Sequence, residues 1–350
     1  MVQALAVQES VIDGIRCIDL SSEVTPMLRA EDQSSRAWAA ADIDPTQCIV
    51  PLGDCERAEL ANVVHSARDV PLPMLLRRPE HFEMPRCEAL MDSVAMSLKD
   101  GPGVAVIDAL PLDDWESDGW KWDDITTLYW IMGQCLSRPV AQKWDGTMLY
   151  DVKDTGQDFG YGVRGSYTNI ELNFHTDNAF GIAPPHYVGL LCLYPAQSGG
   201  VSRFCSLYRV HNEMLRAYPR ELERLYRPML MDRQAEHKTG APRFSHVPMF
   251  RWDGQRLAVR INTGLVRNAY MRADVTPGPE LAGALDALDE ILEDSALLFE
   301  LPLERGQIQY LNNLEVAHYR SEFIDDPDLQ RKRHLLRTWH RESGAPSYDG

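Results

Sequence analysis

Short β-rich segments dominate the chain after Ile170, and they restrict the fold more than any other feature of the sequence. They contain many β-branched and aromatic residues and are separated by turn-forming residues, as strands are. Many short strands with long insertions favour a barrel or jelly roll over a parallel α/β sheet. We therefore expect a mainly β fold with flanking helices, and strands at residues 187–193, 201–206, 246–252, 257–261, 308–311 and 334–339.

Helical patterns precede and interrupt these strands. Apolar residues at helical spacing predict an amphipathic helix over residues 123–136. A helix over 88–99, which should end at Gly101, and a strand over 104–110 come before it. Two further helical patterns cover 211–226 and 279–293, and Pro219 should break the first of them.

The composition changes nowhere sharply enough to mark a second domain, so we expect a single structural domain. Residues 1–100 should form a helical and irregular region packed on a core of residues 101–350, with insertions at about 207–300. Residues 151–168 are polar and glycine-rich, which predicts a loop. A loop of this length in a compact domain is usually functional or disordered, and an active-site lid is our first interpretation.

Acidic residues outnumber basic ones, and this balance limits the partners. Lys plus Arg is 35 and Asp plus Glu is 52, a formal net charge of −17. That charge argues against nucleic acid and against anionic membranes. A small-molecule partner, including an anion held by one or two inward-facing arginines, is compatible with it. The oligomeric state is left open.

The cysteines and the apolar segments indicate a cytoplasmic protein. The seven cysteines are an odd number with no C-x-x-C pair, which favours a reducing compartment. Residues 1–10 lack the basic and apolar regions of a signal peptide. No segment approaches the ~20 apolar residues of a membrane span.

His175 and Asp177 form a His-x-Asp pair between apolar neighbours. Residues two apart in a strand face the same side, so both side chains can reach one metal ion. Asn173 and Glu171 share that face if the strand extends back, which makes them candidate substrate contacts. The alternative is a hydrogen-bonded core histidine followed by an aspartate that caps the next turn.

Arg333 and Arg337 are four residues apart in a predicted strand. They should face the same side, about 13 Å apart at ~3.3 Å per residue. One guanidinium can clamp a carboxylate through two charge-assisted hydrogen bonds, which leaves the other for an anionic group on a substrate. The alternative is two surface arginines on an edge strand.

The order of these parts resembles a known family. His175-x-Asp177 comes first, Gly199-Gly-x-Ser202 follows, Asn312-Asn313 precedes His318, and Arg333 to Trp339 comes near the end. This series resembles the Fe(II)/2-oxoglutarate dioxygenases of the taurine dioxygenase and clavaminate synthase superfamily. The resemblance runs from about Gly101 to the C-terminus and says little about the first hundred residues.

The resemblance implies a double-stranded β-helix (jelly-roll barrel) and a site for each cofactor. His318 becomes the third ligand of an Fe(II) ion beside His175 and Asp177, in the 2-His-1-carboxylate arrangement that leaves positions open for a cosubstrate and O2. Arg333, with Ser202, would hold the far carboxylate of 2-oxoglutarate, and Arg337 would meet the substrate. The amides of Asn312 and Asn313 can fix a turn or orient a ligand. His186 and His334 are the other histidines considered, and His334 should point away from the face of Arg333.

The implied activity is oxidation of a substrate C–H bond with release of succinate and CO2. Halogenases of this superfamily lack the metal carboxylate, so Asp177 favours hydroxylation or a related oxidation. We expect a small amino-acid-like or natural-product substrate; a small sulfonate or other organic acid is the alternative. A metal-dependent oxidase or hydrolase without 2-oxoglutarate, and a catalytically silent barrel that only binds a small acid, are also kept open.

Overall fold

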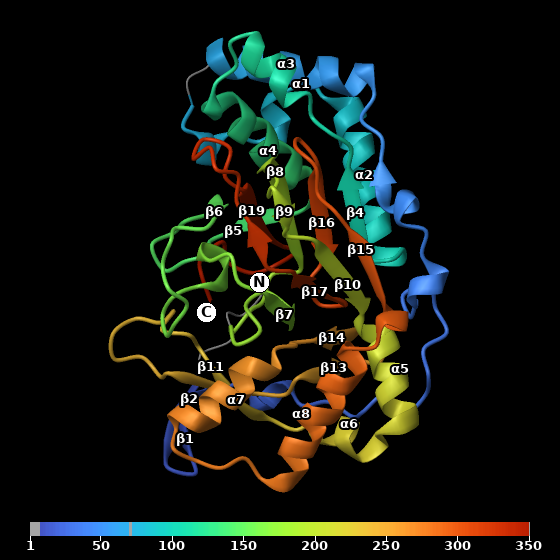
Figure 1. The fold of residues 1–350 in the computed structure, drawn as a ribbon, viewed down its shortest axis with the longest axis vertical. Coiled ribbons are helices and arrows are strands. Elements are labelled where there is room, and N and C mark those ends of the chain that lie inside the picture. The colour runs from blue at the N-terminus through green and yellow to red at the C-terminus, as the bar shows by residue number, and fades with distance from the viewer. Residues whose placement is uncertain (1–7, 70–71, 350) are drawn as a thin grey trace.

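The computed structural model describes residues 8–69 and 72–349, and its largest sheet has seven strands (Figure 1). Neighbouring strands are antiparallel except for the first pair, which is parallel. The sheet runs in the order β3 (Ile49–Val50), β4 (Val104–Ile107), β16 (Ile308–Asn312), β8 (Tyr187–Tyr194), β19 (His334–Arg341) and β5 (Arg138–Val140), and β6 (Tyr150–Val152) also pairs with β19.

Four helices lie together at the top of Figure 1, beside this sheet. They are α1 (Asp54–Asp69), α2 (Pro85–Asp100), α3 (Leu112–Ser117) and α4 (Trp122–Leu136). Apolar residues of α1, α2 and α4 pack against Ile107 and Tyr310 of the sheet in one buried cluster. The start of α4 is fixed by Asp124, whose carboxylate accepts the Lys121 N–H at 2.7 Å, as a capping residue does.

A four-stranded antiparallel sheet carries the metal motif. Its order is β15 (Leu298–Leu301), β10 (Ser202–Ser206), β17 (Val316–Arg320) and β7 (Leu172–His175). In this register His318 of β17 is the direct partner of His175 of β7. The two histidines, 143 positions apart in sequence by subtraction of these numbers, are therefore neighbours across a strand pair.

Most of the remaining elements form the lower part of Figure 1. A sheet of order β1 (Gln8–Ile12), β2 (Ile15–Asp19), β12 (Phe244–Val247) and β11 (Met229–Asp232) lies there with the pair β13 (Phe250–Trp252) and β14 (Leu257–Val259). The helices of this part are α5 (Leu207–Ala217), α6 (Pro219–Leu225), α7 (Thr263–Arg272) and α8 (Pro279–Leu292). Their apolar faces share one buried cluster. A last pair joins β9 (Ser198–Gly199) to β18 (Phe323–Ile324).

The expected helices are present, and Pro219 breaks the 211–226 pattern by starting α6. The predicted strand 246–252 is wrong, because two strands, β12 and β13, occupy this stretch. Residues 1–100 are not only helical and irregular, since Asp13-Gly14 turns the β1–β2 hairpin and β2 pairs with β12 of the insertion. Both turn residues have positive φ (50° and 82°), as a two-residue hairpin turn requires.

The expectation of a mainly β protein is also too narrow. The α-helices contain more residues than the strands, and the described strands form separate sheets with flanking helices, without one closed barrel. No helix within residues 8–69 and 72–349 is long and apolar enough to cross a membrane. Residues 1–7, which belong to the segment examined for a signal peptide, lie outside the described residues.

Candidate metal centre and its cavity

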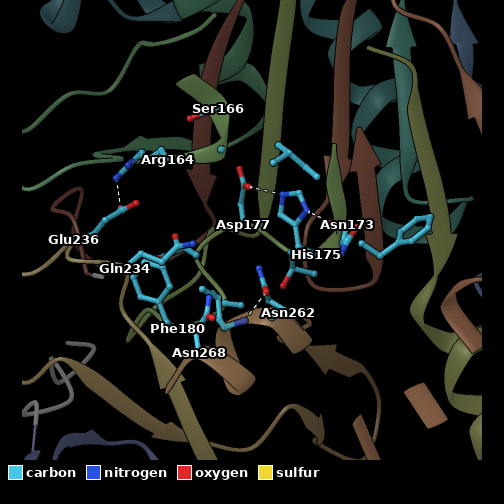
Figure 2. A pocket seen from close by; sticks show the side chains of 18 of the residues that line it. Arg164, Ser166, Asn173, His175, Asp177, Phe180, Gln234, Glu236, Asn262 and Asn268 are labelled. Carbon is cyan, nitrogen blue, oxygen red and sulfur yellow. Dashed lines mark hydrogen bonds and ion pairs between the residues drawn. The ribbon is translucent and has the colours of Figure 1, made fainter. Parts of the chain in front are cut away.

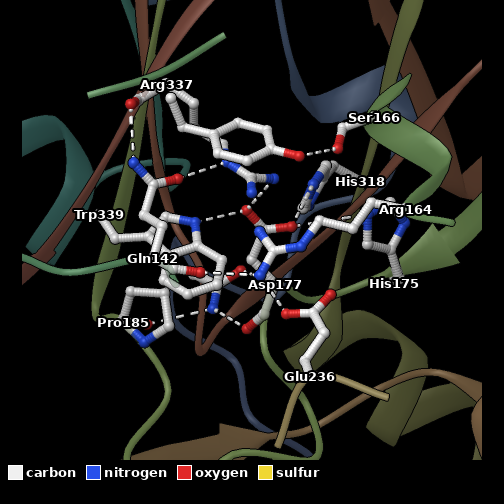
Figure 3. Close-up of polar contacts among 12 residues, drawn as sticks. Gln142, Arg164, Ser166, His175, Asp177, Pro185, Glu236, His318, Arg337 and Trp339 are labelled. Carbon is white, nitrogen blue, oxygen red and sulfur yellow. Dashed lines mark hydrogen bonds and ion pairs between the residues drawn. The ribbon is translucent and has the colours of Figure 1, made fainter. Parts of the chain in front are cut away.

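His175, Asp177 and His318 converge on one point (Figure 3). Oδ1 of Asp177 lies 3.7 Å from Nε2 of His175 and 3.8 Å from Nε2 of His318. One donor atom from each residue lies within 4.8 Å of the others, and no second such group occurs among the described residues. His318 lies inside β17. Two imidazoles and one carboxylate at this spacing fit a divalent first-row metal such as Fe(II).

The second carboxylate oxygen of Asp177 is already occupied. Oδ2 accepts the indole N–H of Trp339 at 2.7 Å and lies 3.0 Å from Nη1 of Arg337. Oδ1 is therefore the oxygen that remains for an ion. His175 is held in the same way, because its Nδ1 contacts the Asn173 carbonyl at 2.7 Å and leaves Nε2 for the metal. Such outer partners fix the tautomer and orientation of metal ligands.

The protonation of the three groups suits metal binding at neutral pH. Burial lowers the pKa of His175, and burial together with the neighbouring His175 lowers the pKa of His318 to about 3. Burial raises the pKa of Asp177, but Arg337, the two histidines and the Trp339 N–H outweigh it and bring that pKa to about 2. The site therefore offers neutral imidazoles and an ionised carboxylate, the forms that bind metals.

Asn313 clamps the backbone of the metal carboxylate. Its Oδ1 accepts the Asp177 N–H at 2.7 Å, and its Nδ2 donates to the carbonyls of Asp177 and Pro185 at 3.0 and 3.1 Å. Asn312 holds the turn before β17, since its Oδ1 accepts the Leu314 N–H at 3.2 Å. These contacts confirm the expected use of the two amides, one to orient a ligand and one to fix a turn.

A cavity of about 350 Å³ opens beside the triad (Figure 2). Its wall includes His175 and Asp177, the predicted contacts Asn173 and Glu171, and apolar side chains such as Phe180. The Glu171 carboxylate accepts a hydrogen bond from the Tyr319 hydroxyl. The loop of residues 151–168 supplies Phe159, Arg164 and Ser166 to the wall, so this loop borders the site as expected.

Arg337 lies on the wall of this cavity as well. Besides its contact to Asp177, it donates from Nε to Oε1 of Gln142 at 2.8 Å and stacks on the rings of Tyr150 and Trp339. Arg337 therefore contacts the metal carboxylate and also borders the cavity. The sequence predicted only that Arg337 contacts the substrate, and its contact with Asp177 was not expected.

Arg333 lies immediately before β19 and is 5% exposed. At the register shift His334 pairs with Tyr194 and Leu335 with Cys192, so the extra residue is Leu193 of β8 and β19 keeps its own alternation of faces; the common face of Arg333 and Arg337 stays a prediction. A Cβ atom on Gly200 would lie 3.0 Å from Nε of Arg333, and Gly200 has a φ of +66°. Glycine at this position therefore leaves room for the guanidinium.

Ser202 pairs with Arg320 across β10 and β17. Arg320 was not among the site residues predicted from the sequence. Arg320 is 6% exposed, and its Cζ, like that of Arg333, lies 4.9 Å from the centre of the Phe323 ring. The signal was available, because Arg320 follows His318 by two residues in one strand and so shares its face. His334 binds Asp151 at 2.6 Å and His186 accepts the Glu342 N–H at 3.4 Å, so neither joins the triad.

The fold and this donor set define a mononuclear non-haem iron oxygenase. The chain belongs to the family described as taurine catabolism dioxygenase TauD, TfdA family, whose profile matches residues 81–339. The resemblance inferred from the motifs is thereby confirmed.

Two curated relatives match the sequence. The chain is 26% identical over 337 residues to the taurine hydroxylase-like protein SAT17 of Stachybotrys chartarum, covering 91% of this chain and 82% of that protein. It is 32% identical over 176 residues to a uridine-5′-phosphate dioxygenase of Streptomyces sp., covering 50% of this chain and 63% of that protein.

Solved structures share the fold. Asparagine oxygenase in complex with Fe(II), 2S,3S-3-hydroxyasparagine and succinate superposes with a TM-score of 0.64 at 19% identity, covering 84% of this chain and 93% of that one. The non-haem iron oxygenase OrfP in complex with Fe and α-ketoglutaric acid gives a TM-score of 0.61 at 18% identity, covering 84% and 94%.

Proposed function

We propose that this protein is an Fe(II)- and 2-oxoglutarate-dependent dioxygenase that oxidises a C–H bond of a small molecule in the cavity beside His175. The observation that carries the proposal is the Asp177 carboxylate, which keeps one oxygen for the ion while Trp339 and Arg337 occupy the other. When bound, Fe(II), 2-oxoglutarate and O2 supply the oxidant, with release of succinate and CO2. The chain supplies position and exclusion of water.

The far carboxylate of 2-oxoglutarate binds at Arg333, and Arg320 adds a second cation there. Nε and Nη1 of Arg320 and Nη1 of Arg333 are buried without a hydrogen-bond partner among the described residues. Asp325, the acid beside Arg333, already pairs with Lys332 at 3.5 Å. Buried cations without a counter-ion are costly, so an anion is expected between them. Ser202, the partner of Arg320 across the two strands, adds a hydroxyl in this proposal.

Arg337 has two roles in this proposal. It holds the outer oxygen of Asp177, and its position on the cavity wall lets it meet an anionic group of the substrate. Asn173 and Glu171 border the same cavity and contribute polar contacts to the substrate. Asp177 occupies the position that a halide would need, which favours hydroxylation over halogenation.

The substrate is amino-acid-like or a related natural product. Support comes from the structural neighbours, whose complexes contain hydroxylated asparagine or hydroxylated arginine together with succinate. The alternative is a small sulfonate or other organic acid, which the family description and the hydroxylase-like relative favour.

Several broader features belong to the same proposal. The architecture is a double-stranded β-helix in one structural domain, supported by two sheets that contribute to one site: β7 and β17 supply the histidines and β19 supplies Arg337 and Trp339. Residues 151–168 act as a lid, because they line the cavity. Tyr161 of this loop also stacks on Arg272, whose Cζ lies 3.8 Å from the centre of the tyrosine ring. A cytoplasmic location is supported by seven free cysteines.

Anaerobic titration of the metal-free protein with Fe(II) and 2-oxoglutarate tests the core of the proposal. We expect a weak visible charge-transfer band that is absent from His318→Ala, with the His318→Ala protein still folded by circular dichroism. Succinate release under O2 then separates an oxygenase from a silent binding protein. A His318→Ala variant that binds Fe(II) as tightly as wild type and still turns over would remove the third ligand from the proposal.

A further inference from the structure

Arg164 and Glu236 form an ion pair on the cavity wall that the metal chemistry does not explain (Figures 2 and 3). Arg164 comes from the 151–168 loop and Glu236 from the loop between β11 and β12. Their side chains are only 12% and 13% exposed. Burying two charges is expensive, and an ion pair alone rarely repays the cost. The pair therefore calls for an explanation beyond stability.

The contacts of the pair use only part of each group. Both hydrogen bonds of Arg164, to the Glu236 carboxylate and at 2.8 Å to the Gln142 carbonyl, leave from Nη2. Both contacts of the Glu236 carboxylate, from Arg164 and at 3.0 Å from the Tyr348 hydroxyl, fall on Oε2. No second carboxylate pairs with Arg164 in residues 8–69 and 72–349. One edge of the guanidinium and one carboxylate oxygen thus remain for a ligand.

The pair is also connected to the metal side of the cavity. Gln142 accepts from Arg164 with its carbonyl and from Arg337 with its side chain, and Arg337 contacts Asp177. The Tyr150 ring contacts both arginines, whose Cζ atoms lie 5.2 and 4.8 Å from its centre. A ligand held by Arg164 and Glu236 therefore lies in the cavity that the metal ligands border.

We propose that Arg164 and Glu236 select a zwitterionic substrate, with its ammonium on Glu236 and its carboxylate or sulfonate on Arg164, on the side of the cavity where Arg337 also lies. This inference rests on the proposed function and names the substrate class of that site. The buried pair is neutral, and a zwitterion keeps it neutral. A ligand with only one charge leaves a net charge in the buried site, and the desolvation of that charge lowers the affinity. The requirement for both charges follows from this balance.

Equilibrium binding to the full-length protein tests the inference. The protein is loaded with 2-oxoglutarate and redox-inactive Mn(II), and calorimetry measures the twenty proteinogenic amino acids, taurine and uridine 5′-phosphate. The tightest amino acid is then compared with the analogues that lack its α-carboxylate or its α-ammonium, which are agmatine and 5-guanidinopentanoate for arginine, or 3-aminopropanamide and succinamate for asparagine. Loss of either charge should weaken binding by roughly 30-fold or more. Two results would overturn the proposal: the probe that binds most tightly carries charge of only one sign, or no zwitterion binds at all.

Two variants assign the two charges. Arg164→Gln should remove the preference for the parent over its decarboxylated analogue, and Glu236→Gln the preference over its deaminated analogue. Arg203→Gln and Glu300→Gln are matched controls, because this 2.6 Å pair is exposed and lies away from the cavity wall. The controls should change neither preference, and Mn(II) and 2-oxoglutarate should bind all four variants as they bind wild type.

A purely structural latch gives a different pattern. Arg164→Gln and Glu236→Gln would then weaken every probe equally, and the charge-swapped Arg164→Glu/Glu236→Arg protein would recover wild-type binding. Either result overturns the inference while leaving the dioxygenase intact. Failure of the dioxygenase itself would appear earlier, as absence of the Fe(II)–2-oxoglutarate band in the wild-type protein.

Discussion

Replacing Trp339 by phenylalanine should weaken metal binding without changing any charge. Trp339 is 3% exposed, and its indole N–H lies 2.7 Å from Oδ2 of Asp177. A hydrogen bond to a charged group contributes about 1.5–3 kcal/mol. This corresponds to roughly a 10- to 150-fold loss of affinity, close to the ~10- to 100-fold typical of such outer partners. Phenylalanine keeps most of the buried ring, and Arg337 still holds Oδ2 from one side.

Anaerobic titration of the apo-protein with Fe(II) measures this loss directly. Trp38→Phe is the matched control, because Trp38 is also 3% exposed and donates an indole hydrogen bond at 2.9 Å, but to the Pro102 carbonyl. Both variants should lose similar stability in urea, and only Trp339→Phe should lose Fe(II) affinity. Equal Fe(II) affinity in wild type and Trp339→Phe would refute the idea that this contact positions the carboxylate.

Three further predictions follow from the same site and its surroundings. Arg333→Ala should raise the Kd for 2-oxoglutarate by roughly 30-fold to several thousand-fold, measured calorimetrically with Mn(II), while Mn(II) affinity stays unchanged. Asp177→Gly should abolish hydroxylation, which mass spectrometry of the product measures. Undiminished formation of hydroxylated product would show that Asp177 is not a ligand. Burial raises the pKa of Glu315 from 4.5 to about 7 despite Arg256, so its ionisation opposes folding and stability should fall as pH rises from about 4.5 through 7. Urea unfolding at pH 5 and pH 8 should show a drop of up to about 3 kcal/mol in wild type and a smaller one in Glu315→Gln, and equal drops would contradict the argument.

Local chemistry in the sequence was enough to locate much of the fold. Pro219 ends one helix and begins another because a proline ring cannot continue a helix. His175 and Asp177 could be paired from the His-x-Asp motif, although not as two residues of one strand, because β7 ends at His175 and Asp177 lies in the turn after it. The Asp13-Gly14 turn was equally readable, because both residues tolerate positive φ, but it was overlooked.

The partners of those residues depended on tertiary structure. Strand register decides which face a residue occupies, and a one-residue shift reverses it. Register therefore placed Ser202 opposite Arg320, and it left Leu193 of β8 without a partner where β8 meets the start of β19.

The sequence by itself determined the metal-binding residue types, the helices α2, α4, α5, α6 and α8 and the class of enzyme, because these depend on short spacings and motif order. Only the tertiary structure decided that Trp339 and Arg337 occupy one oxygen of Asp177, and that Arg164 meets Glu236 on the cavity wall. These contacts join residues that are 72 to 162 positions apart. No local pattern encodes them, because they form only when separate strands and loops pack around one cavity.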